Sequence, residues 1–451
     1  MREWTAERVA AAAGARLVQP PPVGDGGPAR AVVDSRATEA GDLFVGLRGT
    51  HRDGGAFAPH ALAAGAWGVL VDPASADVAR CATPGVLLAA EDPLGALQRL
   101  ATAWRRELDC AVIAVTGSTG KTSTKDILAA MLAPRRRTVP SPANFNTEIG
   151  LPLAVLGAPA GTEALVLELA MRGPRQIAEL TAIAEPDVGV IVNVGPVHLE
   201  VMGTLEAVAA AKGELLRDMP AGGTAVVPAG EPLLAPHLRA DLDTVTFGDG
   251  GDVRLVEDAG DRVVVDARGE RIQLELSYRQ AHNRLNTLAA VAAAQAIGVR
   301  PEGRLDVPFS ALRGERVDLP NGVAVVNDCY NANPMSMRAA LDDLAMTTPG
   351  RRVAVLGDML ELGEREREFH REVGRHATAH DVDLLVTVGP RAVAMLDEFD
   401  GEGHAVADAG EAAALLEELL RPGDTVLVKG SRGVGLEAVV EALAAGAGTA
   451  G

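Results

Sequence analysis

Residues Cys110-Ala-Val-Ile-Ala-Val-Thr116-Gly-Ser-Thr-Gly-Lys-Thr122 decide the fold. The first six are a continuous apolar run, which is typical of a strand buried on both faces of a parallel sheet. A glycine-rich loop follows directly, and a helical pattern begins near Thr122. In a strand–loop–helix unit of this kind, backbone N–H groups and the helix N-terminus face an anion. The sequence therefore predicts a phosphate-binding loop at the end of a parallel strand.

The loop assigns a role to each of its residues. We expect Lys121 to reach the β- and γ-phosphates of ATP and the Thr122 hydroxyl to ligate Mg²⁺. The general form of this loop has a glycine where the chain has Val115, so the match is to a shorter form. The backbone of the remaining residues is predicted to cradle the phosphates: Thr116, Gly117, Ser118, Thr119 and Gly120.

Lysine is rare in this chain. Of 42 basic residues only four are lysines, namely Lys121, Lys125, Lys212 and Lys429. Arginine supplies charge almost everywhere, so a retained lysine indicates a compact donor or an amine nucleophile. Lys125 is the exception and is predicted to be a solvated helix residue. Lys212 lies in an otherwise apolar helical stretch, where it has either a chemical role or a snorkelling side chain.

Composition sets broad limits. A chain of 451 residues predicts two or three domains, and 47% apolar with 23% charged residues is typical of a globular protein. The net charge of −19 argues against non-specific binding to nucleic acid or anionic membranes. No apolar run is long enough to span a membrane. Three dispersed cysteines, Cys81, Cys110 and Cys329, favour reduced thiols in a cytoplasmic protein.

The pattern of apolar runs predicts an α/β protein of three domains. Residues 1–108 hold short strands and helices, and residues 109–312 hold the buried runs Ala164–Leu169 and Val188–Val194. Between 224 and 278 the pattern changes to short alternating strands, which predicts an antiparallel insertion or a flanking sheet. Residues 313–451 alternate again between strands and helices, as in a Rossmann-like unit.

Two polar residues follow apolar strands of the predicted central sheet. Glu168 is an acid inside the run Leu165–Leu169, where a buried carboxylate needs a cation, and it could complete a Mg²⁺ shell. His198 follows the run Val188–Val194, at the end of a strand where α/β proteins bind ligands. The alternatives are an exposed carboxylate at a sheet edge and an ordinary packed histidine.

Two later segments are dense in polar groups. Residues 281–286 open an alanine-rich helix and contain Asn283, whereas residues 323–334 run from a strand into Asp328 and Tyr330. Tyr330 is one of only two tyrosines, and its ring suits adenine stacking. Helix capping by Asn and Asp is the alternative.

Together these segments resemble the Mur ligases of peptidoglycan synthesis over nearly the whole chain. Within that family the strings Tyr-Asn-Ala-Asn-Pro and Gly-Asp-Met-x-Glu-Leu-Gly are similar to those of the branch that adds a dipeptide. The segments that carry the resemblance are Asp34–Arg36, Gly41–Val45, Thr116–Thr122, Asn144–Gly150, Glu168, His198–Glu200, Lys212–Glu214, His282–Asn283, Asp328–Pro334, Leu356–Gly363 and Lys429–Arg432.

The resemblance implies an N-terminal UDP-binding domain, a central P-loop ATPase domain and a C-terminal Rossmann-like ligase domain. It implies ATP-dependent ligation of D-Ala-D-Ala to UDP-MurNAc-tripeptide through an acyl phosphate, by a cytoplasmic and, we expect, monomeric enzyme. Glu168, His198 and Thr122 would hold Mg²⁺, while Lys212 would be carbamylated and support a second Mg²⁺. Lys121, Lys212, Glu168 and His198 are therefore the predicted catalytic residues.

The remaining roles are implied by the same resemblance. Asn283 and Tyr330 would meet adenine, Asp328 the ribose and Arg316 a phosphate. The predicted substrate-binding residues are Ser35 and Arg36 at the UDP end, Asn146 and Thr147 at the muramoyl-peptide, and Lys429 and Arg432 near the dipeptide.

Five positions depart from the family pattern, at Gln280, Gly55, Cys329, Gly314 and Glu315. Two other functions remain open. The chain could be a related Mur-type ligase that adds a single amino acid, or a protein that binds ATP without catalysis.

Overall fold

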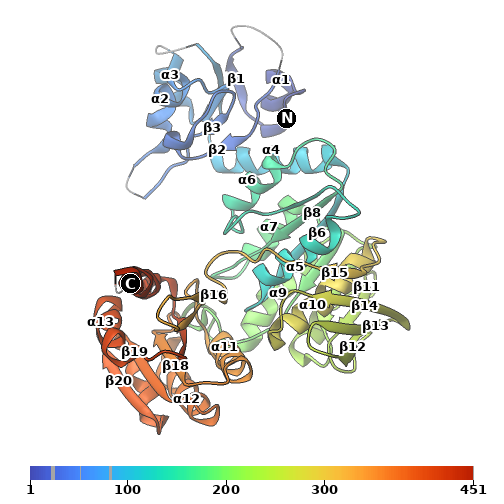
Figure 1. The fold of residues 1–451 in the computed structure, drawn as a ribbon. Helices are drawn as coiled ribbons and strands as arrows, with labels where there is room; N and C mark the ends of the chain where they lie inside the picture. The colour runs from blue at the N-terminus through green and yellow to red at the C-terminus, as the bar shows by residue number, and fades with distance from the viewer. Residues whose placement is uncertain (22–25, 51, 81–83, 450–451) are drawn as a thin grey trace.

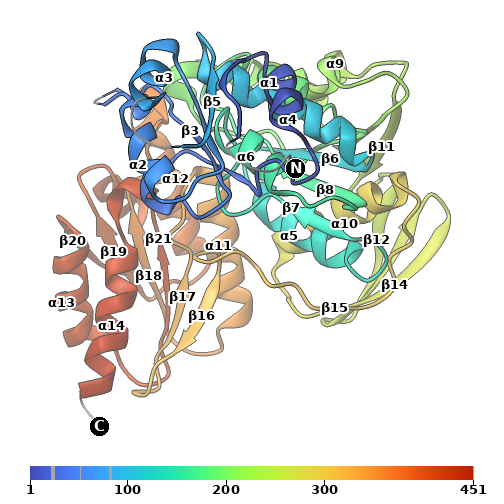
Figure 2. The same ribbon diagram turned by 90° about the horizontal axis from the view of Figure 1, so that it is seen from above.

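The computed structural model describes residues 1–21, 26–50, 52–80 and 84–449, and it has three β-sheets with helices packed around them (Figure 1). The N-terminal sheet lies at one end of the molecule, and the other two lie side by side at the other end (Figures 1 and 2). Parallel pairing dominates all three sheets. The predicted α/β class with three domains is confirmed.

The N-terminal sheet has the strand order β1-β5-β4-β3-β2. Only β1 pairs antiparallel, against β5. Its strands are β1 Arg16–Gln19, β2 Ala31–Val32, β3 Leu43–Val45, β4 Gly68–Val71 and β5 Val86–Ala89. Its helices are α1 Ala6–Ala13, α2 Ala58–Ala63 and α3 Pro73–Arg80, with 3₁₀ turns η1 Ser35–Ala37 and η2 Gly54–Phe57.

Helix α4 (Pro93–Leu108) connects the first two sheets. Asp92 caps it by accepting a hydrogen bond from Gly95 N–H, and the helix contacts α1 on one side and α6 and α7 on the other. Trp104 of α4 packs edge-on against Trp4 at 5.5 Å between ring centroids. One continuous apolar core therefore runs from the N-terminal sheet into the central one.

The central sheet has ten strands in the order β15-β14-β13-β12-β11-β10-β9-β6-β8-β7. The strand of the opening motif, β6, lies between β8 and β9, and its side chains are almost all buried. The first strands are β6 Ala111–Thr116, β7 Thr138–Pro140, β8 Ala164–Glu168 and β9 Val188–Ile191. The helices are α5 Lys121–Leu132, α6 Gly150–Gly157, α7 Gln176–Ala184, α8 Leu199–Met202, α9 Leu205–Asp218 and α10 Ala281–Ala296.

Residues 224–278 extend this same sheet, so they form neither a separate insertion nor a flanking sheet. Strands β10 and β11 pair parallel, and β12, β13 and β14 add an antiparallel meander. Their alternating burial matches a sheet covered on one face. These elements are β10 Thr224–Pro228, η3 Pro232–His237, β11 Asp243–Phe247, β12 Val253–Asp258, β13 Arg262–Ala267, β14 Glu270–Leu276 and β15 Gly303–Leu305.

The C-terminal sheet has the order β16-β17-β21-β18-β19-β20, with β16 antiparallel at one edge. Strands predicted near Val323, Val353, Leu384 and Thr425 are present as β17 Ala324–Asn327, β18 Arg352–Gly357, β19 Leu384–Val388 and β21 Thr425–Lys429. The other elements are β16 Glu315–Asp318, β20 Glu402–Val406, α11 Pro334–Thr347, α12 Glu366–Ala379, α13 Ala409–Leu419, α14 Glu437–Thr449, η4 Gly363–Arg365, η5 Ala392–Glu398 and η6 Arg432–Val434.

The structure bears on the expectations for the cysteines and for membrane-spanning segments. Cys110 and Cys329 are buried free thiols, whereas Cys81 lies outside the described residues. Within the described part of the chain, no helix combines the length and apolarity that crossing a membrane requires.

Candidate active site

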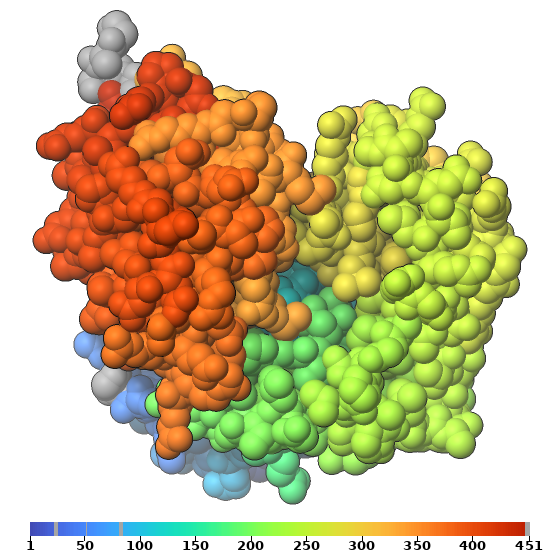
Figure 3. Space-filling model, turned by 90° about the horizontal axis from the view of Figure 1, so that it is seen from below, coloured from blue at the N-terminus to red at the C-terminus, as the bar shows by residue number. Residues whose placement is uncertain are grey.

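A cavity of about 670 Å³ lies between the central and C-terminal domains. Figure 3 shows the hollow between the orange C-terminal part and the yellow-green central part, with teal atoms of the central domain at its floor. The phosphate-loop residues Ser118 to Thr122 line it from one side, and Asp328, Tyr330 and Lys429 line it from the other. The fold thus brings together segments that are 200 to 300 residues apart in sequence.

The phosphate loop is held in place by Asn193, which follows β9. Its Oδ1 accepts hydrogen bonds from the N–H groups of Ser118 and Thr119, both at 3.0 Å, and its amide nitrogen donates to Thr119 O. Gly120 has φ of +77°, and a Cβ there would lie 2.6 Å from Asn286 Oδ1. Only glycine fits this left-handed position at the start of α5.

Lys121 folds back over this loop. Its Nζ donates a 2.8 Å hydrogen bond to Gly117 O and lines the cavity. Burial lowers the pKa of Lys121 below its ordinary value, and the charge of Glu168 opposes that shift. The ammonium therefore lies beside the loop, close enough to Glu168 for the two charges to interact.

Thr122 and Glu168 form a buried oxygen pair at the floor of the cavity. The Thr122 hydroxyl donates a 2.7 Å hydrogen bond to Glu168 Oε2, and Asn146 Nδ2 donates to Oε1 at 2.8 Å. Glu168 is only 2% exposed, which excludes an exposed carboxylate at a sheet edge. A hydroxyl and a carboxylate are hard oxygen ligands, the kind that Mg²⁺ prefers, so this pair fits the predicted metal role.

His198 lines the same cavity as this pair but contacts the other domain. It follows β9 in a left-handed conformation (φ 53°), and its Nδ1 makes an ion-pair contact with Glu361 Oε2 of the C-terminal domain. Burial lowers the pKa of His198, whereas Glu361 acts in the opposite direction. His198 lines the cavity, so the structure brings it together with Thr122 and Glu168.

Lys212 is a buried lysine on α9, outside the cavity lining. The residue is 2% exposed, which excludes a snorkelling side chain, and among the described residues nothing forms a hydrogen bond or ion pair with its Nζ. Burial, and secondarily the charge of Lys121, place its pKa well below the ordinary value. An uncompensated buried ammonium is costly, so the neutral amine is favoured.

Lys125 differs from the prediction. We expected a solvated helix residue, and that expectation is wrong. The side chain is buried, and Nζ donates a 2.9 Å hydrogen bond to Ser141 O while lying 3.2 Å from Asp126 Oδ1. Because Ser141 Oγ in turn accepts from Glu168 N–H, Lys125 supports the strand that carries Glu168. The spacing of residues along α5 did not show that the face of the helix carrying Lys125 is buried.

The C-terminal side of the cavity centres on Lys429 at the end of β21. Its Nζ lies 2.6 Å from Asp328 Oδ2 and donates to Asn331 O at 3.0 Å. Asn283, buried on α10, lines the same cavity and accepts a 3.0 Å hydrogen bond from Asn286. The capping alternative holds for Asn333, which forms a capping box with Ser336 at the start of α11.

Tyr330 lines the cavity, but one face of its ring is covered. The Arg313 guanidinium carbon lies 4.1 Å from the ring centroid, a cation–π geometry. Arg313 also lines the cavity, although no motif in the sequence marks it as a site residue. Arg316, the predicted phosphate contact, lies on β16 outside the cavity lining and pairs with Asp318 at 3.0 Å.

Three of the predicted substrate-binding residues also lie outside the cavity lining. Asn146 and Thr147 line it from the central domain. Ser35 and Arg36 form η1 in the N-terminal domain, where Arg36 is 86% exposed and pairs with Asp34. Arg432 is exposed on η6 and pairs with Glu437 at 3.4 Å. The structure therefore does not gather these residues around the phosphate loop.

Comparisons with known proteins agree with this arrangement. Residues 115–294 match the Mur ligase middle domain, and residues 312–432 match the Mur ligase glutamate ligase domain. UDP-N-acetylmuramoyl-tripeptide–D-alanyl-D-alanine ligase of Synechocystis sp. is 37% identical over 421 residues, covering 91% of each chain. The chain belongs to the MurF ligase family.

Other MurF family members show the same relationship. The enzyme of Mycobacterium tuberculosis is 38% identical over 465 residues, with 91% of each chain covered. A crystal structure of MurF from Acinetobacter baumannii superposes with a TM-score of 0.88 at 29% identity, covering 98% of this chain and 99% of that one. MurF from Thermotoga maritima, solved with ADP, gives a TM-score of 0.82 at 31% identity, covering 94% and 98%.

Proposed function

We propose that this chain joins D-Ala-D-Ala to the terminal carboxylate of UDP-MurNAc-tripeptide, with cleavage of ATP to ADP and phosphate. One observation carries the proposal. The phosphate loop with its Thr122–Glu168 oxygen pair faces Lys429 and Asp328 across a single cavity. An ATP site in one wall and polar groups in the other suit a reaction between a phosphorylated carboxylate and an amine.

ATP would bind on the central-domain wall. Loop N–H groups and Lys121 meet the phosphates, and Thr122, Glu168 and His198 are the residues that would hold Mg²⁺. Bound Mg²⁺ offsets the repulsion between the γ-phosphate and the substrate carboxylate. The contact of His198 Nδ1 with Glu361 leaves Nε2 to bind the metal, and it would couple metal binding to the position of the C-terminal domain.

Lys212 would be carbamylated and support a second Mg²⁺. CO₂ adds only to a neutral amine, forming an N–C bond and releasing one proton. The burial of Lys212 and its lack of a counter-ion among the described residues favour that neutral form. Carbamylation would convert the buried neutral amine into a carboxylate-like anion, which arginine cannot become.

The proposed reaction proceeds in two steps. A carboxylate oxygen of the tripeptide attacks the γ-phosphorus, the bond to ADP breaks, and an acyl phosphate forms. The dipeptide amine then attacks the carbonyl carbon, the C–O bond to phosphate breaks, and the nitrogen loses a proton. Lys121 would stabilise charge at the transferred phosphoryl group, and closure of the central and C-terminal domains over the cavity would limit attack by water on the acyl phosphate.

The remaining contacts follow the walls of the cavity. Asn146 and Thr147 would meet the muramoyl-peptide, while Asn283, Asp328 and Tyr330 would meet the nucleoside. Since Arg316 lies outside the lining and Arg313 within it, we assign to Arg313 the phosphate contact predicted for Arg316. Lys429 would lie near the incoming dipeptide, with Arg432 at the closing interface.

We assign one function to each domain. Residues 1–108 would bind UDP through the segment that contains Ser35 and Arg36, residues 109–312 would bind ATP, and residues 313–451 would bring the dipeptide. The enzyme would act as a monomer in the cytoplasm. Light scattering after gel filtration tests the oligomeric state directly.

The experiment that tests the function measures phosphate release from ATP with UDP-MurNAc-tripeptide as acceptor. Release should depend on D-Ala-D-Ala, and mass spectrometry should find the pentapeptide product. Acceptors with diaminopimelate or lysine at the third position identify the preferred peptide. Release that requires a single amino acid and a shorter acceptor would contradict the proposal, and so would ATP binding without release with any acceptor.

A further inference from the structure

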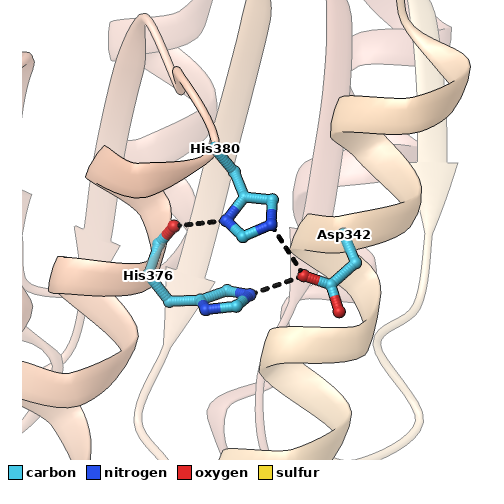
Figure 4. Close-up of side chains that lie close together, drawn as sticks. All are labelled: Asp342, His376 and His380. Atoms are coloured by element: carbon cyan, nitrogen blue, oxygen red, sulfur yellow. Dashed lines mark hydrogen bonds and ion pairs between the residues drawn. The ribbon is translucent and has the colours of Figure 1, made fainter.

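A cluster of Asp342, His376 and His380 lies outside the active-site cavity, on the packed pair of helices α11 and α12 (Figure 4). Each residue offers one ligand atom, and the three atoms all lie within 4.8 Å of one another. In the part of the chain that the structure describes, no other three His, Cys, Asp or Glu side chains meet this way. None of the three belongs to the cavity lining.

The two histidines lie on one face of the chain because they are four residues apart. His376 is in the last turn of α12, and His380 is the residue that ends the helix. Their rings are 4.1 Å apart between centroids, and both Nε2 atoms point at the same oxygen of Asp342 on α11 (Figure 4). Two histidines at this spacing on a helix are a known metal-binding arrangement.

Hydrogen bonding fixes the tautomer of His380. Its Nδ1 lies 2.9 Å from the backbone oxygen of His376, which can only accept, so Nδ1 carries the proton. In the neutral ring Nε2 then bears a lone pair, yet it lies 3.0 Å from Asp342 Oδ1, another acceptor. Either an additional proton or a cation must lie between them. A ring nitrogen that donates to a backbone carbonyl while the other faces outward is the usual orientation of a metal-ligating histidine.

The ligand geometry suits a small divalent ion. His376 Nε2 lies 2.6 Å and His380 Nε2 3.0 Å from Asp342 Oδ1. Ligands about 2.0–2.2 Å from a tetrahedral zinc are themselves about 3.2–3.6 Å apart, so a small rotation of these side chains admits the ion. Imidazole with carboxylate favours zinc over magnesium or calcium. Side-chain exposures of 22%, 30% and 43% leave the fourth position open to water.

We propose that Asp342, His376 and His380 form a divalent transition-metal site that binds Zn²⁺ and joins α11 to α12. Ser336, Ala340 and Asp343 of the same helix α11 belong to the cavity lining. The metal therefore stabilises the helix that forms one wall of the cavity, without touching the reacting groups. The proposal does not depend on which acceptor or amine the enzyme uses.

The test is a zinc titration of tag-free, full-length protein at pH 7.5 against a chromogenic zinc indicator, with excess Mg²⁺ to occupy the active site. Wild type should bind one equivalent more than the His376→Ala/His380→Ala variant, whose affinity at this site should fall about 100-fold or more. Asp342→Asn, which keeps the side-chain shape, should also weaken binding. His404→Ala removes a part-exposed histidine of the same domain and should leave the titration unchanged.

Two further readouts test the same site without the zinc indicator. Zn²⁺ should raise the melting temperature of wild type and of His404→Ala, but not of the double variant. Anomalous diffraction at the zinc edge should place a peak about 2.0–2.2 Å from both Nε2 atoms. Equal stoichiometry in all proteins, or a zinc-saturated crystal with no peak at this cluster, would overturn the proposal and leave a protonated His–Asp pair as the explanation.

Discussion

The hydroxyl of Thr122 lies 2.7 Å from Oε2 of Glu168, and this hydrogen bond joins the first turn of α5 to the end of the neighbouring strand β8. The two residues are 46 positions apart in sequence. Parallel pairing of β6 with β8 brings them together, because the carboxyl ends of both strands lie at one edge of the sheet. That edge is where the cavity opens.

Glu168→Gln should separate charge from shape at this pair. The amide can still accept from Thr122, so the melting temperature should change little. Loss of the negative charge should lower kcat about 10²–10³-fold, the usual effect of removing one electrostatic contact to a transition state. Steady-state phosphate release together with a thermal melt checks this. A kcat within threefold of wild type would rule out a role for Glu168 in holding the metal.

Lys212→Arg should abolish turnover although it retains a positive charge, because arginine cannot form a carbamate. Lys125→Arg is the matched control, since Lys125, like Lys212, is buried in the central domain outside the cavity lining, but its Nζ has a hydrogen-bond partner in Ser141 O. If both variants lose stability but only Lys212→Arg loses turnover, enlargement of a buried side chain is not the cause. In addition, wild-type activity should fall in CO₂-depleted buffer and return with bicarbonate. Activity independent of CO₂ would contradict the carbamate.

Asn193→Ala should weaken ATP binding. The Asn193 side chain accepts from Ser118 N–H and Thr119 N–H, so its removal frees the loop at a cost of about 1–3 kcal/mol in stability. We expect KM for ATP to rise about tenfold and kcat to change less. Asn321→Ala, which removes an acceptor from Val323 N–H in a distant turn, is the control and should leave KM unchanged. An equal rise in KM for both variants would count against a specific role in the loop.

Asp343→Asn should stabilise the protein at neutral pH. Burial, and secondarily the charge of Asp328, raise the pKa of Asp343 from 3.8 to about 6. Between these values the folded state binds more protons than the unfolded state, so the contribution of this carboxyl to stability falls as pH rises through that window. At pH 7.5 we expect a gain of about 1–2 kcal/mol, less than the full shift implies because the side chain borders a cavity that admits solvent.

Urea unfolding at pH 7.5 and at pH 4 measures this difference. The gain should vanish at pH 4, where the carboxyl is protonated in the folded state. Asp381→Asn is the control, since that carboxylate is 92% exposed in the same domain. A gain of the same size at both pH values would point to packing rather than to charge.

Lys429 and Asp328 should be energetically coupled. Their side chains are 3% and 22% exposed, and removal of either leaves the other charge poorly solvated. A double-mutant cycle with Lys429→Met and Asp328→Asn should give a coupling free energy of about 1–3 kcal/mol. The exposed pair Arg304–Asp306 should give less than about 0.5 kcal/mol. Equal coupling in both pairs would show that burial does not strengthen the first.

The sequence by itself determined the elements that depend on local pattern. The apolar run before Thr116 required a buried parallel strand, the loop to Thr122 required a phosphate site at a helix start, and an acid inside a buried strand required a partner. The sequence did not separate the four lysines, since Lys121 and Lys429 line the cavity whereas Lys125 and Lys212 are both buried outside its lining. Hydrophobic periodicity and local hydrogen bonding depend on residues close together in sequence, so they can be predicted from the sequence of one segment.

Only the tertiary structure decided which distant groups meet. Three contacts depend on packing between elements far apart in sequence. Asn193 hydrogen-bonds the phosphate loop, Arg313 lies over Tyr330, and Lys125 is buried against Ser141. The same is true of Asp342 with His376 and His380, which no local pattern links across two helices. Side-chain contacts of this kind are set by strand order and by helix packing on the sheets, and neither is encoded in the spacing of residues along one segment.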